Sequence, residues 1–93
     1  MDNLKSLTDL PNIGKVLAEK LSLIGINNEE DLKMKGSEQT IVELSRLENS
    51  GVCINMFMAL EGAIQRIRWH HLDKEKKEQL KEFFATFILN PIK

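Results

Sequence analysis

The chain has 93 residues and a net charge of −1, with 42% hydrophobic and 29% charged residues. This length and balance predict one globular domain with a single core, and they exclude a disordered or collagen-like chain. The near-neutral charge argues against a protein that coats nucleic acid electrostatically, and the apolar runs are too short to span a membrane.

The predicted elements are all helices. Leu and Ile supply most of the branched apolar residues, whereas Val and Thr are scarce and Tyr is absent, so strand-forming residues are few. Apolar residues recur at spacings of three and four, as on one face of a helix. We therefore predict an all-α fold, a compact bundle of five to six helices forming one domain over residues 1–93. The expected helices span residues 3–8, 14–24, 28–36, 37–47, 54–69 and 74–89.

Four residues are expected to set helix boundaries in the first half of the chain. Pro11 ends the first helix, because the residue before a proline avoids the helical region. Gly25 stops the second helix, Asn28 caps the third, and Gly36 closes the third before the fourth begins. The predicted inner faces contain Leu17, Leu21, Ile24, Ile41, Leu44, Leu47 (or Val42), Phe57, Leu60, Ile64, Ile67, Leu80, Phe83, Phe84, Phe87 and Ile88.

The connection Leu10-Pro11-Asn12-Ile13-Gly14 joins the first two predicted helices and is the most specific local feature. Gly14 supplies backbone freedom, and Ile13 places an apolar anchor between the helices. Amides in the first turn of the second helix point outward, where the helix dipole favours an anion such as a DNA phosphate. The alternative is a tight helical turn that binds nothing. The candidate phosphate contacts are Asn12, Ile13, Gly14, Lys15, Val16 and Lys20.

These residues carry a resemblance to known proteins. The hairpin, with Leu17-Ala18-Glu19-Lys20-Leu21 and Gly25-Ile26 after it, resembles the helix-hairpin-helix class, whose members grip the DNA backbone through hairpin amides. Asn12 stands where a second glycine is common in such hairpins. Its side chain leaves the hairpin backbone less room to approach a phosphate. With Gly51-Val52-Cys53-Ile54-Asn55, Ala59-Leu60-Glu61-Gly62-Ala63 and Trp69-His70-His71-Leu72, the chain from about Leu4 to Leu80 is similar to the C-terminal domain of the TfoX (Sxy) family of competence regulators. The resemblance implies a small helical domain, which usually follows a separate N-terminal α+β domain that is absent from this sequence.

A second candidate patch combines basic and aromatic residues near the end of the fifth predicted helix. Arg66, Arg68, Trp69 and His70 can contact a phosphate or stack on a base, and the alternative is a solvated helix flank. Gly62 lies inside the same helix, where glycine costs about 1 kcal/mol relative to alanine. Its presence predicts the close approach of another helix, the second or the sixth.

No catalytic site, metal site or cofactor is predicted. Cys53 lies between Val52 and Ile54, which is typical of a small buried hydrophobe. His70 and His71 diverge on a helix, and there is no further histidine to complete a metal site. A single cysteine and the lack of a signal peptide at the N-terminus indicate a cytoplasmic protein.

Three functions remain open from the sequence. The first is a non-enzymatic regulatory module that binds another protein, or a second copy of itself, through an apolar helix face to which Met56 and Met58 can contribute. The second is a helix-hairpin-helix domain that contacts double-stranded DNA weakly and without sequence preference. The third is an enzyme, for which no constellation of catalytic residues and no small-molecule substrate is evident.

Overall fold

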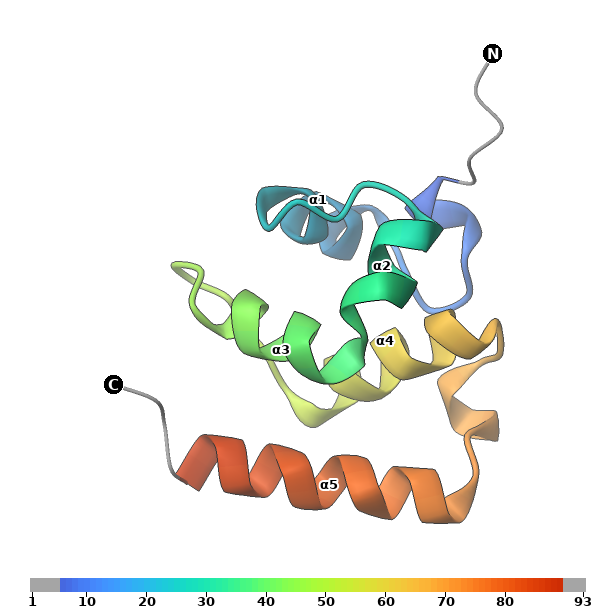
Figure 1. The fold of residues 1–93 in the computed structure, drawn as a ribbon, viewed down its shortest axis with the longest axis vertical. Helices are drawn as coiled ribbons and strands as arrows, with labels where there is room; N and C mark the ends of the chain where they lie inside the picture. Colours follow the sequence, from blue (N-terminus) through green and yellow to red (C-terminus); the bar gives the residue numbers. More distant parts are fainter. Residues whose placement is uncertain (1–5, 90–93) are drawn as a thin grey trace.

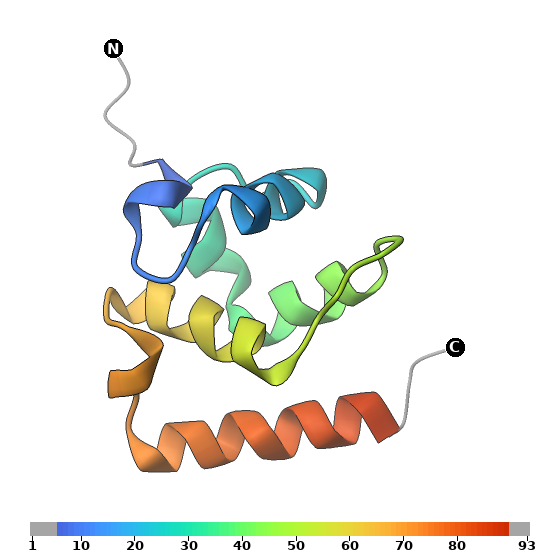
Figure 2. The same ribbon diagram turned by 180° about the vertical axis from the view of Figure 1, so that it is seen from behind.

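Residues 6–89 are described by a computed structural model, in which helices are joined by short connections (Figures 1 and 2). The predicted all-α fold is confirmed, since residues 6–89 contain no strand. No helix in this range has the length and apolarity to cross a membrane. The elements in chain order are the 3-10 turn η1 (Leu7–Asp9), α1 (Lys15–Leu23), α2 (Glu29–Lys35), α3 (Ser37–Ser45), α4 (Ile54–Gln65), the 3-10 turn η2 (Trp69–His71) and α5 (Lys74–Leu89).

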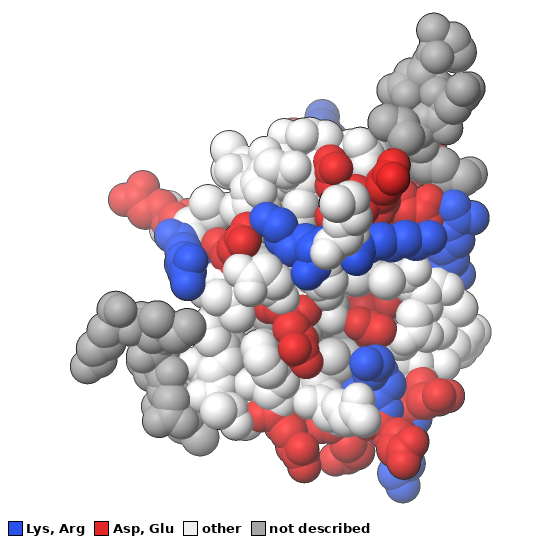
Figure 3. Space-filling model, in the orientation of Figure 1, with Lys and Arg blue, Asp and Glu red and all other residues white. Residues whose placement is uncertain are grey.

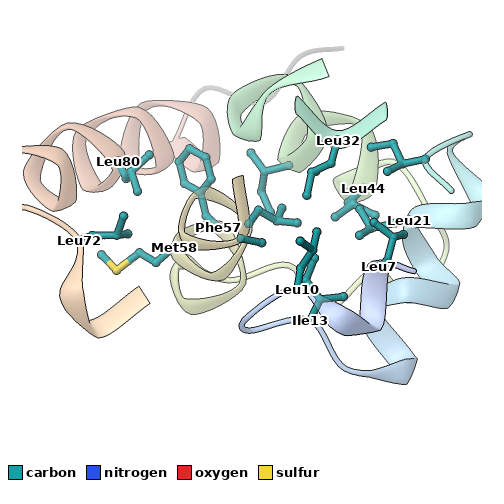
Figure 4. Close-up of a cluster of buried hydrophobic side chains, with 14 residues drawn as sticks. Leu7, Leu10, Ile13, Leu21, Leu32, Leu44, Phe57, Met58, Leu72 and Leu80 are labelled. Carbon is teal, nitrogen blue, oxygen red and sulfur yellow. The ribbon is translucent and has the colours of Figure 1, made fainter. Parts of the chain in front are cut away.

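Helix α4 occupies the centre of the fold. Its residues Phe57, Leu60 and Ala63 are completely buried. Because α2, α3, α5 and η2 all contact α4, one set of buried side chains continues from α5 past α4 to α1 (Figure 4). Removal of this apolar surface from water is the main force that stabilises the fold. The core contains Leu7, Leu10, Ile13, Leu21, Ile26, Leu32, Ile41, Leu44, Phe57, Met58, Leu60, Ala63, Leu72 and Leu80.

Helix α5 packs against α4 through an aromatic stripe. The ring of Phe57 lies 5.6 Å from that of Phe83 and 6.1 Å from that of Phe84, measured between centroids. Leu80 is buried beside them, which confirms that this face of α5 belongs to the core. The predicted contribution of Ile88 lies outside the side chains that the structure describes.

The predicted helix-boundary signals at Gly25, Asn28 and Gly36 are confirmed, whereas Pro11 follows only the 3-10 turn η1 within the described residues. The side chain of Asn28 accepts a hydrogen bond from the amide of Asp31 at 2.9 Å and so caps α2. Gly25 adopts φ 87°, and the amide of Ile26 reaches back to the carbonyl of Leu21 at 2.9 Å. This is the Schellman end expected of a helix that stops at glycine. Gly36, at φ 83°, separates α2 from α3.

Two predicted helices extend more than one residue beyond the observed C-terminal ends. Helix α3 ends at Ser45 rather than at residue 47, because the amides of Arg46 and Leu47 bond three residues back and tighten the last turn. Helix α4 ends at Gln65 rather than at residue 69, because Arg66 turns left-handed at φ 62°. The short turn η2 then follows as a separate element.

The helix-hairpin-helix motif is not confirmed. Only the 3-10 turn η1 precedes the connection at Pro11 in the described residues, and residues 3–5 of the first predicted helix lie outside them. The prediction that Cys53 is buried is wrong, because this residue is the N-cap of α4 and is exposed. The chain enters α4 from the surface loop around Gly51, so the residue before the helix remains at the surface.

Candidate functional site

Asn12 joins the N-terminal connection to the far end of α4. It adopts φ 72°, a left-handed conformation that asparagine tolerates better than most residues, and it follows Pro11 as in a type II turn. Its Nδ2 atom donates to the carbonyl oxygens of Ile67 at 2.9 Å and Ala59 at 3.4 Å. Its Oδ1 atom accepts the amide hydrogen of Trp69 at 3.2 Å. The side chain therefore satisfies backbone groups of the protein and does not point toward a ligand.

The close packing at Gly62 comes from this connection. A Cβ atom on Gly62 would lie 2.6 Å from Asn12 Nδ2, 2.8 Å from the carbonyl oxygen of Ile67 and 3.2 Å from the Cα atom of Trp69. The neighbours are thus the connection before α1 and the segment that leads from α4 into η2. The prediction that the second or the sixth predicted helix approaches Gly62 is wrong. Glycine is required here because two irregular segments meet against α4.

Arg66, which ends α4, is held by an ion pair with Glu29 of α2. The amide of Ile67 bonds the carbonyl of Gly62 at 2.9 Å, so a Schellman turn forms with arginine in the usual glycine position. The Nε atom of Arg66 lies 2.5 Å from Glu29 Oε2, and its second guanidinium nitrogen lies 2.6 Å from Oε1. The hydrogen bonds from Arg66, helped by Lys33 at 3.3 Å, lower the pKa of Glu29 from 4.5 to about 2.

The predicted basic and aromatic patch is only partly available to a ligand. Arg66 uses its guanidinium to bind Glu29, whereas Arg68 and His70 are exposed. Trp69 is half-buried against the core, and the ring of His70 stacks on it at 4.0 Å. Nucleic-acid binding by these four residues stays a prediction, and Arg68 and His70 are the members free to contribute polar contacts.

The six hairpin residues divide into two groups. Ile13 is buried in the core, as predicted, and Asn12 is bound to the end of α4. Lys20 is also occupied, because its Nζ atom donates to the carbonyl oxygen of Ser50 at 2.6 Å. The remaining three are exposed at the start of α1, where the N-cap makes no side-chain hydrogen bond: Gly14, Lys15 and Val16.

Three exposed apolar side chains were not predicted to form a surface together, and only Val16 among them is a predicted site residue, as a candidate phosphate contact. Val16 and Leu23 of α1 are 67% and 72% exposed, and Met34 of α2 is 80% exposed. Met56 and Met58, which the sequence offers as surface contacts, are instead half-buried and buried. The spacing of Leu17, Leu21 and Ile24 already places residues 16 and 23 away from the inner face of α1, but α2 is too short for a clear period.

Two open hollows lie beside α2. One, of about 310 Å³, is lined by Gly25, Ile26, Asp31, Met34 and Lys35. The other, of about 400 Å³, lies between the first turn of α3 and α5, with Val42, Leu80 and Phe83 among its walls. Its two lysines are paired with carboxylates of the protein, since Lys35 binds Glu43 and Lys76 lies 3.9 Å from Glu61.

Glu61 and Thr40 are polar groups near the second hollow whose roles differ. Glu61 accepts a hydrogen bond from the hydroxyl of Ser37 at 2.7 Å and another from Gln65 at 2.8 Å. The hydroxyl of Thr40 is buried without a hydrogen-bond partner. Among the described residues, no three His, Cys, Asp or Glu side chains gather as metal ligands.

The geometry defines a small all-helical domain in which Asn12 is hydrogen-bonded to the segment after α4. Large apolar side chains are exposed on α1 and α2. The family model described as the TfoX C-terminal domain matches residues 3–84. The chain therefore belongs to this family, which confirms the resemblance found in its sequence.

Two solved structures share this fold at high identity. An uncharacterized protein from Listeria monocytogenes, in a triclinic crystal form, is 42% identical with a TM-score of 0.84, over 92% of this chain and 96% of that chain. A protein of unknown function from the same species, in a tetragonal form, is 44% identical with a TM-score of 0.82, over 87% of this chain and 98% of that chain. The search among curated proteins gave no match.

Proposed function

We propose that this chain is a non-enzymatic regulatory module that binds another protein, or a second copy of itself, through the α1–α2 surface, defined as Val16, Leu23 and Met34. The carrying observation is that these three large apolar side chains are at least 67% exposed. One exposed apolar residue is ordinary on a protein surface. Three of them in consecutive helices provide an apolar area that a partner can cover.

The arrangement of α1 and α2 supports this proposal. Val16 and Leu23 are seven residues apart, so they lie on one face of α1 about 10 Å apart along the helix axis. Lys35 Nζ lies 3.4 Å from the carbonyl oxygen of Ile24, which keeps the end of α2 beside the end of α1. Met34 borders the 310 Å³ hollow between these ends, where an apolar side chain of a partner can insert.

The regulatory part of the proposal comes from the family. The chain resembles the C-terminal domain of competence regulators, and the match covers residues 3–84. The side-chain geometry supports binding over catalysis, because both lysines of the 400 Å³ hollow are engaged in ion pairs with Glu43 and Glu61.

Size-exclusion chromatography of a cell extract tests the proposal, with the protein detected by an antibody. Wild type is expected to elute as a complex larger than its 10.7 kDa monomer. Leu23→Glu places a charge on the α1–α2 surface and is expected to elute as the monomer. Gln79→Glu, which changes an exposed residue on α5, is the matched control and should elute with wild type. Monomeric elution of wild type, or equal effects of the two substitutions, contradicts the proposal.

A second candidate is weak, sequence-independent contact with a DNA backbone at the start of α1. The observation that favours it is the exposure of Gly14 and Lys15 at an N-terminus without a side-chain cap. The exposed, apolar Val16 beside them and the engagement of Asn12 and Lys20 inside the protein reduce the number of available phosphate contacts. One or two contacts give binding that is readily lost with added salt.

A further inference from the structure

The charges of α2 make this helix complementary to an inverted copy of itself. Its first turn is acidic and its last turn is basic. Glu29 is engaged with Arg66 and lies 3.3 Å from Lys33, whose side chain is still 48% exposed. Glu30 and Met34 are exposed as well. Residues three and four apart are neighbours on a helix, so these three side chains lie along one outward side of α2.

We propose that a second copy of this chain covers that side of α2, with the two α2 helices antiparallel about a two-fold axis. The inference rests on the proposed function and names the occupant of the same surface. In a two-fold interface each contact occurs twice, so Glu30 of each protomer faces Lys33 of the partner subunit. Antiparallel helices also place the negative end of one dipole beside the positive end of the other.

Apolar contacts add to this charge pairing. Met34, which is 80% exposed, lies one turn after Glu30 and is covered when the helices meet. Lys35, the residue after Met34, bonds the carbonyl of Ile24, the residue after Leu23, so the ends of the two helices are neighbours. The 310 Å³ hollow between these segments provides space for an apolar side chain from the second copy.

The charge of the surrounding face favours a copy of the chain over a strongly charged partner. Both signs of charge lie on the face that carries α2, where a row of basic side chains crosses the middle and acidic side chains lie on either side of it (Figure 3). A strongly acidic or basic partner would meet like charges there at close range, which is costly. An inverted copy meets opposite charges at Glu30 and Lys33 because both signs lie on the same helix.

The expected dimer is weak. Helix α2 has seven residues and is therefore about 10 Å long. Even with Leu23 included, such a contact falls at the small end of specific interfaces, below ~1,200 Å² in total. We therefore expect reversible association with a dissociation constant in the micromolar range or weaker.

Sedimentation equilibrium of the purified full chain, at concentrations up to about 1 mM, tests this arrangement. Wild type is expected to form a reversible dimer. Glu30→Lys and Lys33→Glu should each raise the dissociation constant about tenfold, because each juxtaposes like charges. The double variant restores opposite charges and should return to within about threefold of wild type. Glu82→Lys on the exposed side of α5 is the control and should dimerise normally.

Met34→Glu provides an independent check that alters no ion pair, and it should abolish dimerisation. Thermal unfolding of every variant shows whether the fold is retained. The proposal is overturned if wild type is monomeric at every concentration or if the single charge reversals leave the dissociation constant unchanged. It is also overturned if the double variant dimerises as weakly as the single variants. If the pure chain is monomeric while Leu23→Glu still dissolves the complex in extracts, the self-association fails and the proposed function stands.

Discussion

A methyl group on Gly62 of α4 would lie 2.6 Å from the side-chain nitrogen of Asn12, which belongs to the connection before α1. The same methyl would lie 2.8 Å from the carbonyl oxygen of Ile67, to which Asn12 donates its hydrogen bond at 2.9 Å. Gly62 and Asn12 thus allow the N-terminal connection to pack closely against the end of α4.

Gly62→Ala is expected to destabilise the protein although alanine favours helices. Helix propensity alone predicts a gain of about 1 kcal/mol. The contact with the carbonyl oxygen of Ile67 involves backbone that cannot move aside freely, and overpacking of this kind costs roughly 1–3 kcal/mol. Urea unfolding is expected to show a net loss of stability. A variant as stable as wild type would contradict the close contact.

Asn12→Gly provides the partner variant, because glycine accepts the left-handed backbone at φ 72°. It leaves the carbonyl of Ile67 and the amide of Trp69 without their bonds, a loss of roughly 1–3 kcal/mol in the free energy of unfolding. In a double-mutant cycle, Gly62→Ala should cost less in the Asn12→Gly background, since the nearest clashing atom is gone. Strict additivity would show that the two sites are independent.

Arg66 allows backbone strain and side-chain contacts to be separated. Arg66→Ala removes the ion pair with Glu29 and keeps a Cβ atom at φ 62°. Arg66→Gly removes the same ion pair and relieves the left-handed strain, which is worth roughly 1–2 kcal/mol per residue. Chemical denaturation should find the glycine variant more stable than the alanine variant by about 1 kcal/mol. Equal stabilities would mean that this position is not strained.

The ion pair of Glu29 predicts a pH dependence. Because Arg66 holds the pKa of Glu29 at about 2 in the folded state, against 4.5 ordinarily, its contribution to stability is complete above pH 4.5. The contribution falls as the pH drops from 4.5 toward 2. The free energy of unfolding of wild type should therefore exceed that of Glu29→Gln at pH 7, with the difference shrinking below pH 4.5. A difference that is constant down to pH 2 would contradict the assignment.

Any DNA contact should map to the start of α1. In an amide NMR titration with a short duplex at low salt, small shifts are expected at Gly14, Lys15 and Val16, and added salt should abolish them. Lys15→Glu should remove these shifts, whereas Lys81→Glu on α5 should not. Shifts that cluster at residues 66–71 instead would place the contact on the basic and aromatic patch. Amides that stay still at millimolar DNA would exclude the hairpin contact.

The boundaries of α2 and the end of α1 follow from local sequence, whereas the hydrogen bonds of Asn12 to the end of α4 do not. Asn28 and Gly25 act on amides and carbonyls within a few residues, so their roles depend on nearby chain alone. Asn12 bonds Ile67 across 55 positions, so its side chain looks free for a ligand until the fold is known. The turn at Arg66 has no glycine to signal it and is stabilised by Glu29 from another helix.

The sequence allows the outward position of two of the three residues of the α1–α2 surface to be predicted, but not that of Met34. The period of α1 implies that Val16 and Leu23 point outward, because Leu21 of the opposite face is fully buried. Met34 carries no such signal, since a seven-residue helix has fewer than two full turns to show a period. Methionine is typical of both cores and adaptable binding surfaces, so residue type alone does not separate Met34 from the buried Met58.

Photochemical crosslinking in living cells tests the central claim most directly. A photoreactive amino acid replaces Leu23 in one strain and Gln79 on α5 in another, and the adducts are resolved by mass after illumination. If the α1–α2 surface binds protein, position 23 should give a discrete adduct that contains a second polypeptide, and position 79 should not. The absence of adducts at position 23, or the same adducts from both positions, would contradict the account.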